Sequence, residues 1–510
     1  MATKKRFAFN ITMNSIGMAF GMLIPFFLTP IVIRSLGNEA YGIWILSVST
    51  VGYLGLLDLG LRSAVIRYVS KADASGHELE ARKAIGAALW FRILLAVCAV
   101  FLSVVLAFIF PHLFKVPNGL TRPAQITVLM CAIAVAVTLV SGVFSAVLSA
   151  IHRFDVTSTI IMCQTGARAA GVLLILRSGR GLIALAYWEL FVTALAGIAT
   201  WAAATRIFPA CRVGLGRPDI KTLKMIWSYS MTTFVIIIAA QIIYSTDNIV
   251  VGAFISVGAV VFYSIGGSLI MYSRQVVASV VTTFVPMASN LEAAGDLTGL
   301  RRLLLRGTQA TLGLAIPILL VLVFRGKTFI SLWMGPRYSV EAGTVLQILM
   351  ISQTVWVANT TAGQISFGIE KHKSVAKWSI IEASVNLTLS ILLAKSIGIY
   401  GVAWGTSIAA VVIQLSFWPR FVRRELGVPV KTYLWDGWGK IFVCSVPFAI
   451  TCAVADRYWH PASMLVFFSQ ILVTLPVYLA SSLWLFKDEL RILWTNWKKP
   501  KTLEAEAQYE

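Results

Sequence analysis

The sequence has little of what a soluble enzyme needs. Only 13% of its 510 residues are charged, its five histidines are scattered, and its six cysteines have no ligand-like spacing. We find no Asp-x-Asp pair, complete glycine-rich phosphate loop or histidine pair at helical spacing, which are patterns that hold metals and phosphates in many enzymes. The gaps between apolar runs are about twenty residues at most, too short for a soluble domain. We therefore expect no enzymatic activity, metal site, cofactor or disulfide framework.

Long apolar runs fill the chain instead. The mean hydropathy is +0.81, and about fourteen runs are long enough, or nearly so, to cross a hydrocarbon core of about 30 Å. Lipid offers no partners to backbone polar groups, so these runs are expected to be helices. We predict spans at residues 9–33, 41–61, 84–110, 124–150, 156–176, 182–204, 225–251, 256–286, 308–324, 342–366, 378–394, 398–418, 441–455 and 463–486.

The charge of the chain is strongly asymmetric. It has 43 Lys and Arg against 22 Asp and Glu, a formal net charge of +21. The basic residues gather in alternate gaps between spans, and cytoplasmic loops are the ones enriched in Lys and Arg, so both termini are predicted to be cytoplasmic. These residues flank apolar spans and form no stripe with interleaved aromatics. Membrane lipid headgroups are therefore the expected partners, and nucleic acid is not.

Ionisable residues inside the predicted spans are the candidate functional residues. Each costs roughly 2.5 to 3.5 kcal/mol at mid-bilayer and so usually faces a partner or a cavity. Arg92, deep in the third span, is the best candidate to bind an anion, because a guanidinium offers a planar fork of donors. Snorkelling toward cytoplasmic water is its alternative role. The further candidates for a pyrophosphate or anionic glycan are Arg62, Arg67, Arg168 and Arg274.

Two ion pairs are predicted from spacing. Arg168 and Glu189 flank a short outer turn, each roughly 12 Å below it along its helix, so they can pair as a structural salt bridge or as a switchable pair in a cavity. Asp58 precedes Arg62 by about one helical turn near the inner end of the second span, which favours an intrahelical pair.

Acidic and amide side chains within the spans are candidates for ion coupling or for lining a cavity. Asp247 stands in the run Ser-Thr-Asp-Asn, where it could coordinate a cation or carry a proton. Glu382 and Asn386 lie about one turn apart on one face, where they could bind a proton, an ion or a sugar hydroxyl, or join two helices. Glu189 and Asp58 complete this set. The sequence leaves proton, sodium and no coupling ion open.

A faint internal repeat, at an offset of about 220 residues, relates the turn after the first span to the turn after the seventh. It predicts two six-helix lobes. We expect an N-terminal lobe at 1–206, a cytoplasmic linker at 207–224, a second lobe at 225–420, a pair of helices at 421–497 and a disordered tail at 498–510.

Short motifs along most of the chain resemble one family. They are Leu36-Gly37, Tyr41-Gly42-Ile43-Trp44, Leu57-Asp58-Leu59-Gly60-Leu61, Arg67-Tyr68, Asp247-Asn248 with Gly252, Leu332-Trp333-Met334-Gly335, and Glu382 to Asn386 leading to Gly398-Ile399-Tyr400-Gly401 and Val402-Ala403-Trp404-Gly405. Together they resemble the polysaccharide-specific transporters, the O-antigen and exopolysaccharide flippases of the multidrug/oligosaccharidyl-lipid/polysaccharide exporter superfamily. The resemblance implies an all-α fold in the bacterial inner membrane, with two six-helix lobes forming a V around a central cavity, two C-terminal helices and alternating access.

The resemblance also implies a cargo, an oligosaccharide on polyprenyl pyrophosphate moved to the outer leaflet for polysaccharide assembly, with a polymerase and co-polymerase as further partners. Three alternatives stay open. A lipid II flippase has arginines in its first helix, and residues 9–33 have none. A cation-coupled multidrug exporter would be expected to have carboxylates without competing arginines in the first lobe. A non-transporting scaffold of a polysaccharide synthase complex would be indifferent to loss of Arg92 or Arg168.

Overall fold

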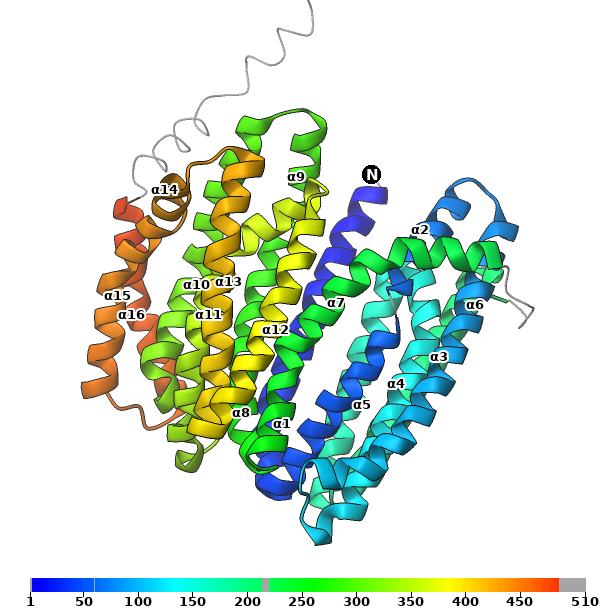
Figure 1. Cartoon of the computed structure of the whole chain (residues 1–510), viewed down its shortest axis with the longest axis horizontal. Coiled ribbons are helices and arrows are strands. Elements are labelled where there is room, and N and C mark those ends of the chain that lie inside the picture. Colours follow the sequence, from blue (N-terminus) through cyan, green and yellow to red (C-terminus); the bar gives the residue numbers. More distant parts are fainter. Residues whose placement is uncertain (1, 59, 213–219, 486–510) are drawn as a thin grey trace, which may run out of the picture. The chain divides into compact units, whose positions relative to one another are not determined.

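The computed structural model describes residues 2–58, 60–212 and 220–485, and every regular element in these ranges is helical (Figure 1), which confirms the all-α class. The predicted tail and residues 213–219 of the predicted linker lie outside them. The elements are α1 (Ala2–Gly52), η1 (Tyr53–Asp58), α2 (Leu61–Ala74), α3 (Glu78–Leu113), η2 (Asn118–Leu120), α4 (Thr121–Ala150), α5 (Phe154–Arg177), α6 (Leu182–Ile207), η3 (Pro209–Cys211), α7 (Ile220–Phe254), α8 (Ala259–Val281), α9 (Phe284–Ala293), α10 (Leu297–Trp333), α11 (Pro336–Gly368), α12 (His372–Ile397), α13 (Ile399–Leu426), α14 (Val430–Thr432), η4 (Tyr433–Gly439), α15 (Lys440–Tyr458) and α16 (Met464–Leu485).

The predicted membrane spans are confirmed as long apolar helices. Among the described residues, 12 helices could cross a membrane, or 13 if the bent pair Ile237–Ile243 and Ser245–Phe254 is one span. The first, Ala19–Ala74, is 56 residues long and contains the second predicted span together with residues 19–33 of the first. The break between those two spans is at Gly37, whose φ is 78°. Glycine suits this position because a Cβ disfavours positive φ.

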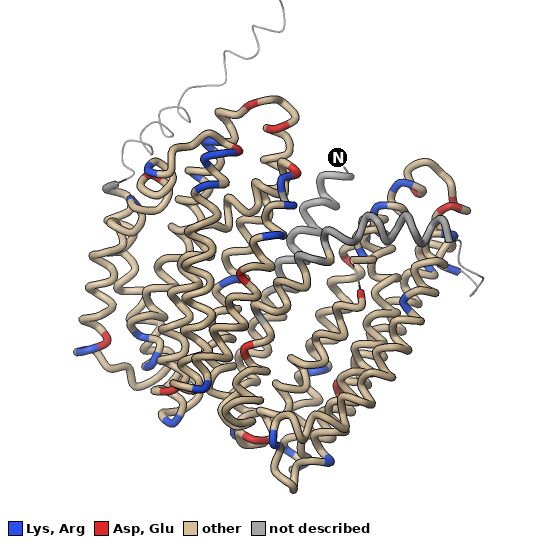
Figure 2. Tube along the Cα trace, in the orientation of Figure 1, with Lys and Arg blue, Asp and Glu red and all other residues tan. Residues whose placement is uncertain are grey.

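The chain divides into two compact units. Unit 1 comprises Met1–Ser268 and Lys373–Ala409, and unit 2 comprises Leu269–His372 and Ala410–Glu510. In unit 1, α7 packs on α1 and α2 as well as following them in sequence. The predicted lobe boundaries are a different partition of the chain and stay a prediction. Within each unit, Lys, Arg, Asp and Glu gather mainly toward the helix ends (Figure 2).

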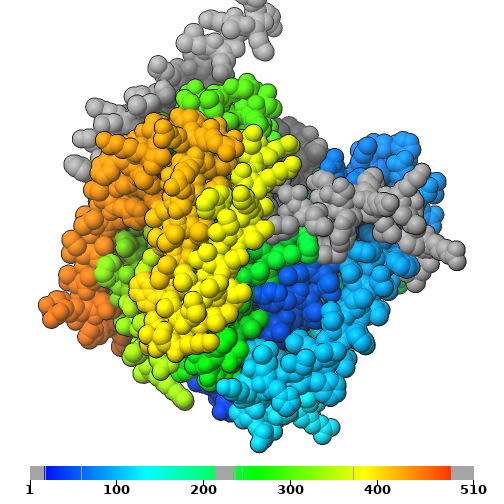
Figure 3. All heavy atoms as spheres, viewed as in Figure 1, coloured from blue at the N-terminus to red at the C-terminus, as the bar shows by residue number. Residues whose placement is uncertain are grey.

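Helix α15 shows how unit 2 meets its surroundings. Cys444, Phe448 and Cys452 are buried on one side, where α15 packs against α10 and α16. Val443 and Ile450 are more than half exposed on another side, and α15 lies at the surface in the space-filling view (Figure 3). Water would oppose such exposure at about 25 cal/mol per Å², whereas lipid does not. This helix therefore has one protein-facing side and one lipid-facing side.

A buried arginine ties α10 to the C-terminal helices. The ninth predicted span ends at residue 324, but α10 continues to Trp333 and so includes Arg325. Arg325 is 1% exposed, and its Nη2 donates to Gln470 Oε1 at 2.5 Å and to the Trp459 carbonyl oxygen at 3.3 Å. The guanidinium also lies 4.9 Å from the ring centroid of Phe467. Because a buried charge needs such partners, these contacts fix the α15–α16 connection against α10.

A close helix contact gives a stability prediction for unit 1. A Cβ at Gly42 in α1 would overlap with the carbonyl oxygen of Val257, whereas a Cβ at Gly166 in α5 would meet nothing within 4 Å. We expect Gly42→Ala to lower the free energy of unfolding by about 1 to 3 kcal/mol, because backbone has to move. Gly166→Ala, the control, should be neutral or slightly stabilising. Thermal unfolding in detergent measures both, and equal melting temperatures would contradict the packing argument.

Candidate functional site

Arg92 is buried in an ion pair between α3 and η1. It is 2% exposed, its Nη2 donates to Asp58 Oδ1, and its Nη1 donates to the Leu139 carbonyl oxygen of α4 at 2.8 Å. Gly142 makes room for the guanidinium, because a Cβ there would overlap with Nη1. The charge is compensated, and almost none of the guanidinium is accessible to an anion. In this conformation the geometry favours a structural role for Arg92.

The predicted pair between Asp58 and Arg62 is wrong, because Asp58 pairs with Arg92. The second span does not run through Asp58 as an α-helix. It tightens into the 3-10 turn η1 and restarts as α2 after Gly60, whose φ is 72°. The break turns Asp58 away from the face that the i, i+4 spacing assumed. Arg62 and Arg67 are exposed on α2, and Arg62 is near enough to Arg92 for their charges to repel.

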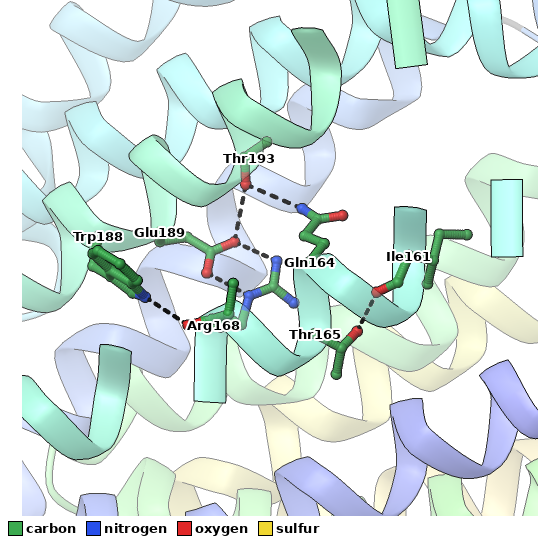
Figure 4. A network of polar contacts seen from close by, with 8 residues as sticks. Ile161, Gln164, Thr165, Arg168, Trp188, Glu189 and Thr193 are labelled. Carbon is green, nitrogen blue, oxygen red and sulfur yellow. Dashed lines mark hydrogen bonds and ion pairs between the residues drawn. The ribbon is translucent and has the colours of Figure 1, made fainter. Parts of the chain in front are cut away.

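Arg168 and Glu189 pair as predicted. Arg168 Nε donates to Glu189 Oε2 and Nη2 donates to Oε1, both at 2.7 Å, which is a bidentate bridge between α5 and α6 (Figure 4). Thr193 donates to Glu189 Oε1 at 3.3 Å, and Gln164 Nε2 lies 3.5 Å from the Thr193 hydroxyl. The Arg168 side chain is 40% exposed and that of Glu189 19%. Unlike Arg92, this pair is accessible.

Arg274 on α8 is oriented by two side chains of α11. Its Nε donates to Gln353 Oε1 at 2.7 Å, and its guanidinium carbon lies 5.0 Å from the ring centroid of Trp356. Gln353 is fully buried and also donates to Ser273 at 3.2 Å. An amide and an indole ring orient a guanidinium and stabilise it.

Asp247 is buried among hydroxyl groups. Tyr263 donates to its Oδ2 at 2.6 Å, and Thr406 of α13 donates to the same atom at 2.8 Å. The residue is 6% exposed. Its neighbour Asn248 donates to Ser49 of α1 at 3.2 Å. Two hydroxyls can donate to a carboxylate and hold it in place. They can also rotate, so that their oxygens accept a hydrogen bond from the protonated carboxyl group or face a bound cation.

The remaining candidates lie on α12. Asn386 is 1% exposed, and Glu382 is half-buried one turn earlier on the same helix. Unit 1 contains Arg92 with Asp58, Arg168 with Glu189, and Asp247 with its hydroxyls, whereas Arg274 belongs to unit 2.

Three functional partners were missed by sequence reasoning. Tyr263 and Thr406 bind Asp247, and Gln353 binds Arg274. Gln353 could have been found from the sequence, because an amide inside an apolar span usually has a hydrogen-bond partner on another helix. Cys211, outside the spans, is not a reactive nucleophile: it is buried, and burial raises the pKa of its thiol to about 12.

Long apolar helices with charges paired between them define a polytopic membrane protein. The chain matches the family described as polysaccharide biosynthesis protein over residues 7–292, and it belongs to this family. It is 22% identical to the "Uncharacterized membrane protein EpsK" of Bacillus subtilis (strain 168) over 84% of this chain and 85% of that protein. It is also 22% identical to the "Putative O-antigen transporter" of Shigella flexneri, over 67% of this chain and 81% of that protein.

Solved structures show the same fold. The lipid II flippase MurJ, in an inward closed conformation, superposes with a TM-score of 0.76 at 17% identity, over 93% of this chain and 99% of that chain. An inward-facing MATE multidrug resistance transporter of the MOP superfamily superposes with a TM-score of 0.67 at 13% identity, over 82% of this chain and 98% of that chain. The expected MurJ- and MATE-like transporter fold is therefore confirmed.

The Arg92–Asp58 pair gives a prediction that separates a structural from a ligand-binding role. We expect Arg92→Ala to cost about 3 kcal/mol of stability, because it leaves Asp58 unpaired. The double variant Arg92→Met/Asp58→Leu should recover most of that loss, because both charges are removed together. Melting temperatures in detergent measure both effects. An Arg92→Ala protein that keeps its melting temperature and loses transport would instead support the anion-binding role predicted from sequence.

Proposed function

We propose that this protein is a flippase for polyprenyl-pyrophosphate-linked oligosaccharide repeat units. It moves them from the cytoplasmic to the outer leaflet of the bacterial inner membrane by alternating access, with both termini in the cytoplasm, and it has no catalytic activity. The family match over residues 7–292 carries this proposal. A polymerase and co-polymerase would then use the delivered units. A lipid II-type flippase is the second candidate, because MurJ has the same fold.

Arg274 is the arginine best suited to the pyrophosphate. Arg92 and Arg168 are each neutralised by a carboxylate, so neither supplies net charge. The Gln353 amide and the Trp356 ring fix the direction of the Arg274 guanidinium. A guanidinium held in this way presents a planar fork of donors to phosphate oxygens. Arg62 and Arg67, exposed on α2, would make the first contact with the pyrophosphate at the cytoplasmic side.

Asp247 is the proposed coupling site. Its carboxylate is buried and held by two hydroxyls, which gives a proton or a sodium ion a set of oxygen neighbours. Asp247 lies on α7 and Thr406 on α13, so the site joins two segments of unit 1 that are far apart in sequence, and its occupation would change the contact between them. Glu382 and Asn386 on α12 are second candidates for the same role.

Transport in proteoliposomes tests the cargo. The substrate is lipid-linked oligosaccharide extracted from cells that lack this protein, and the readout is the glycan that becomes accessible to an added glycosidase. We expect Arg274→Met to reduce the initial rate at least tenfold, because a charged hydrogen bond to phosphate is worth about 1.5 to 3 kcal/mol. Arg337→Met, at an exposed arginine at the start of α11, is the control. No transport by folded wild-type protein would refute the flippase, and equal rates would refute the role of Arg274.

Imposed gradients test the coupling site. With the same vesicles, Asp247→Asn should abolish acceleration by a proton or sodium gradient and should keep gradient-free exchange, because asparagine retains the hydrogen-bonding shape without the charge. Asp73→Asn, at an exposed aspartate of α2, is the matched control. Acceleration by the gradient that survives in Asp247→Asn would place coupling elsewhere.

A further inference from the structure

The ion pair between α5 and α6 leaves part of Arg168 unused. Nε and Nη2 are both bound to Glu189, and Nη1 has no partner among the described residues. Figure 4 shows this third nitrogen on the side of the guanidinium away from the carboxylate. Gln164 lies one turn earlier on α5, on the same face, and its Oε1 is likewise without a partner in the described part of the chain. A free donor and a free acceptor thus lie next to each other.

Arg168 lies in the middle of α5, which exposes apolar side chains on more than one side. Cys163, Ala170 and Leu174 lie roughly 140° around the helix from Arg168, at about 100° per residue, and the exposed Ile161 lies roughly 20° from it. Arg168 lies roughly 12 Å from the end of its helix, where contact of an exposed charge with hydrocarbon is costly. Its side chain is nevertheless 40% exposed, so the open side of its guanidinium needs polar contacts.

The site is held rigidly. Trp188 of α6 donates to the Ala167 carbonyl oxygen at 3.2 Å, and its indole packs on Gly171, where a Cβ would overlap with the ring. This contact sets the spacing of α5 and α6 on either side of the ion pair. The bidentate bridge then fixes the guanidinium plane, so Nη1 has one direction in which to donate.

Net charge decides what can bind. Arg168 and Glu189 sum to zero, and an anion that approached Nη1 would also approach the carboxylate. A sugar hydroxyl has no such penalty, and it can accept from Nη1 while it donates to Gln164 Oε1. We infer that Gln164, Arg168 and Glu189 form a subsite for the uncharged hydroxyls of the glycan, separate from the pyrophosphate contact. This inference rests on the proposed function and assigns Arg168 to the sugar rather than to the anion.

Binding of two lipids to the full-length protein tests the subsite. One probe is the lipid-linked oligosaccharide extracted from cells lacking the protein, and the other is undecaprenyl pyrophosphate without a glycan. The variants are Gln164→Leu, which leaves the ion pair intact, and Arg168→Met/Glu189→Met, which removes both charges together so that none is left unpaired. Thr165→Val is the matched control, because the Thr165 hydroxyl donates only to the Ile161 carbonyl oxygen of its own helix (Figure 4).

We expect the glycan-bearing lipid to bind about fivefold more weakly to Gln164→Leu, which loses a neutral hydrogen bond, and about tenfold more weakly to Arg168→Met/Glu189→Met, which loses one to a charged group. Both variants should bind undecaprenyl pyrophosphate as the wild type does. Wild-type affinity of both variants for the glycan-bearing lipid would show a structural salt bridge and overturn the subsite alone. Equal loss of both lipids would also overturn it. A folded wild-type protein that binds neither lipid would overturn the proposed cargo, and the subsite with it.

Discussion

The cost of placing charge in hydrocarbon governs the structure of this protein. Arg92, Arg168 and Arg325 each lie within a long apolar helix, and each is held by groups from another helix. Their partners are 34, 21 and 145 residues away in sequence. A membrane helix gains little from burying apolar surface against its neighbours, since lipid is equally apolar. Pairing these charges is therefore also what specifies which helices lie side by side within each unit.

The position of a residue along its helix could be predicted from the sequence. The side of the helix on which its side chain lies could be predicted only in part. Hydropathy located the helices because the bilayer requires a fixed length of apolar chain. The pair of Arg168 with Glu189 was predictable because a short turn puts two antiparallel helices in register. Asp58 was assigned to the wrong arginine because the prediction assumed a continuous helix, whereas η1 and Gly60 interrupt it.

Neutral partners could not be predicted in the same way. Thr406 lies 159 residues from Asp247, and Gln353 lies 79 residues from Arg274. A threonine or glutamine in an apolar span is compatible with many neighbours, and one sequence does not choose among them. A charged residue in an apolar span indicates a partner, because an unpaired charge there has a high free-energy cost. Hydroxyls and amides can satisfy part of their hydrogen bonding within their own helix, as Thr165 does.

Formal charge and available charge are different quantities in such a protein. Counting arginines made the first six spans look suited to an anion, but Asp58 and Glu189 cancel the charge of Arg92 and Arg168. A transporter must also release its cargo, so a site has to bind well enough to load and weakly enough to unload. A guanidinium already neutralised by a carboxylate makes hydrogen bonds without a strong Coulombic attraction. That property suits contact with the uncharged sugars of a cargo.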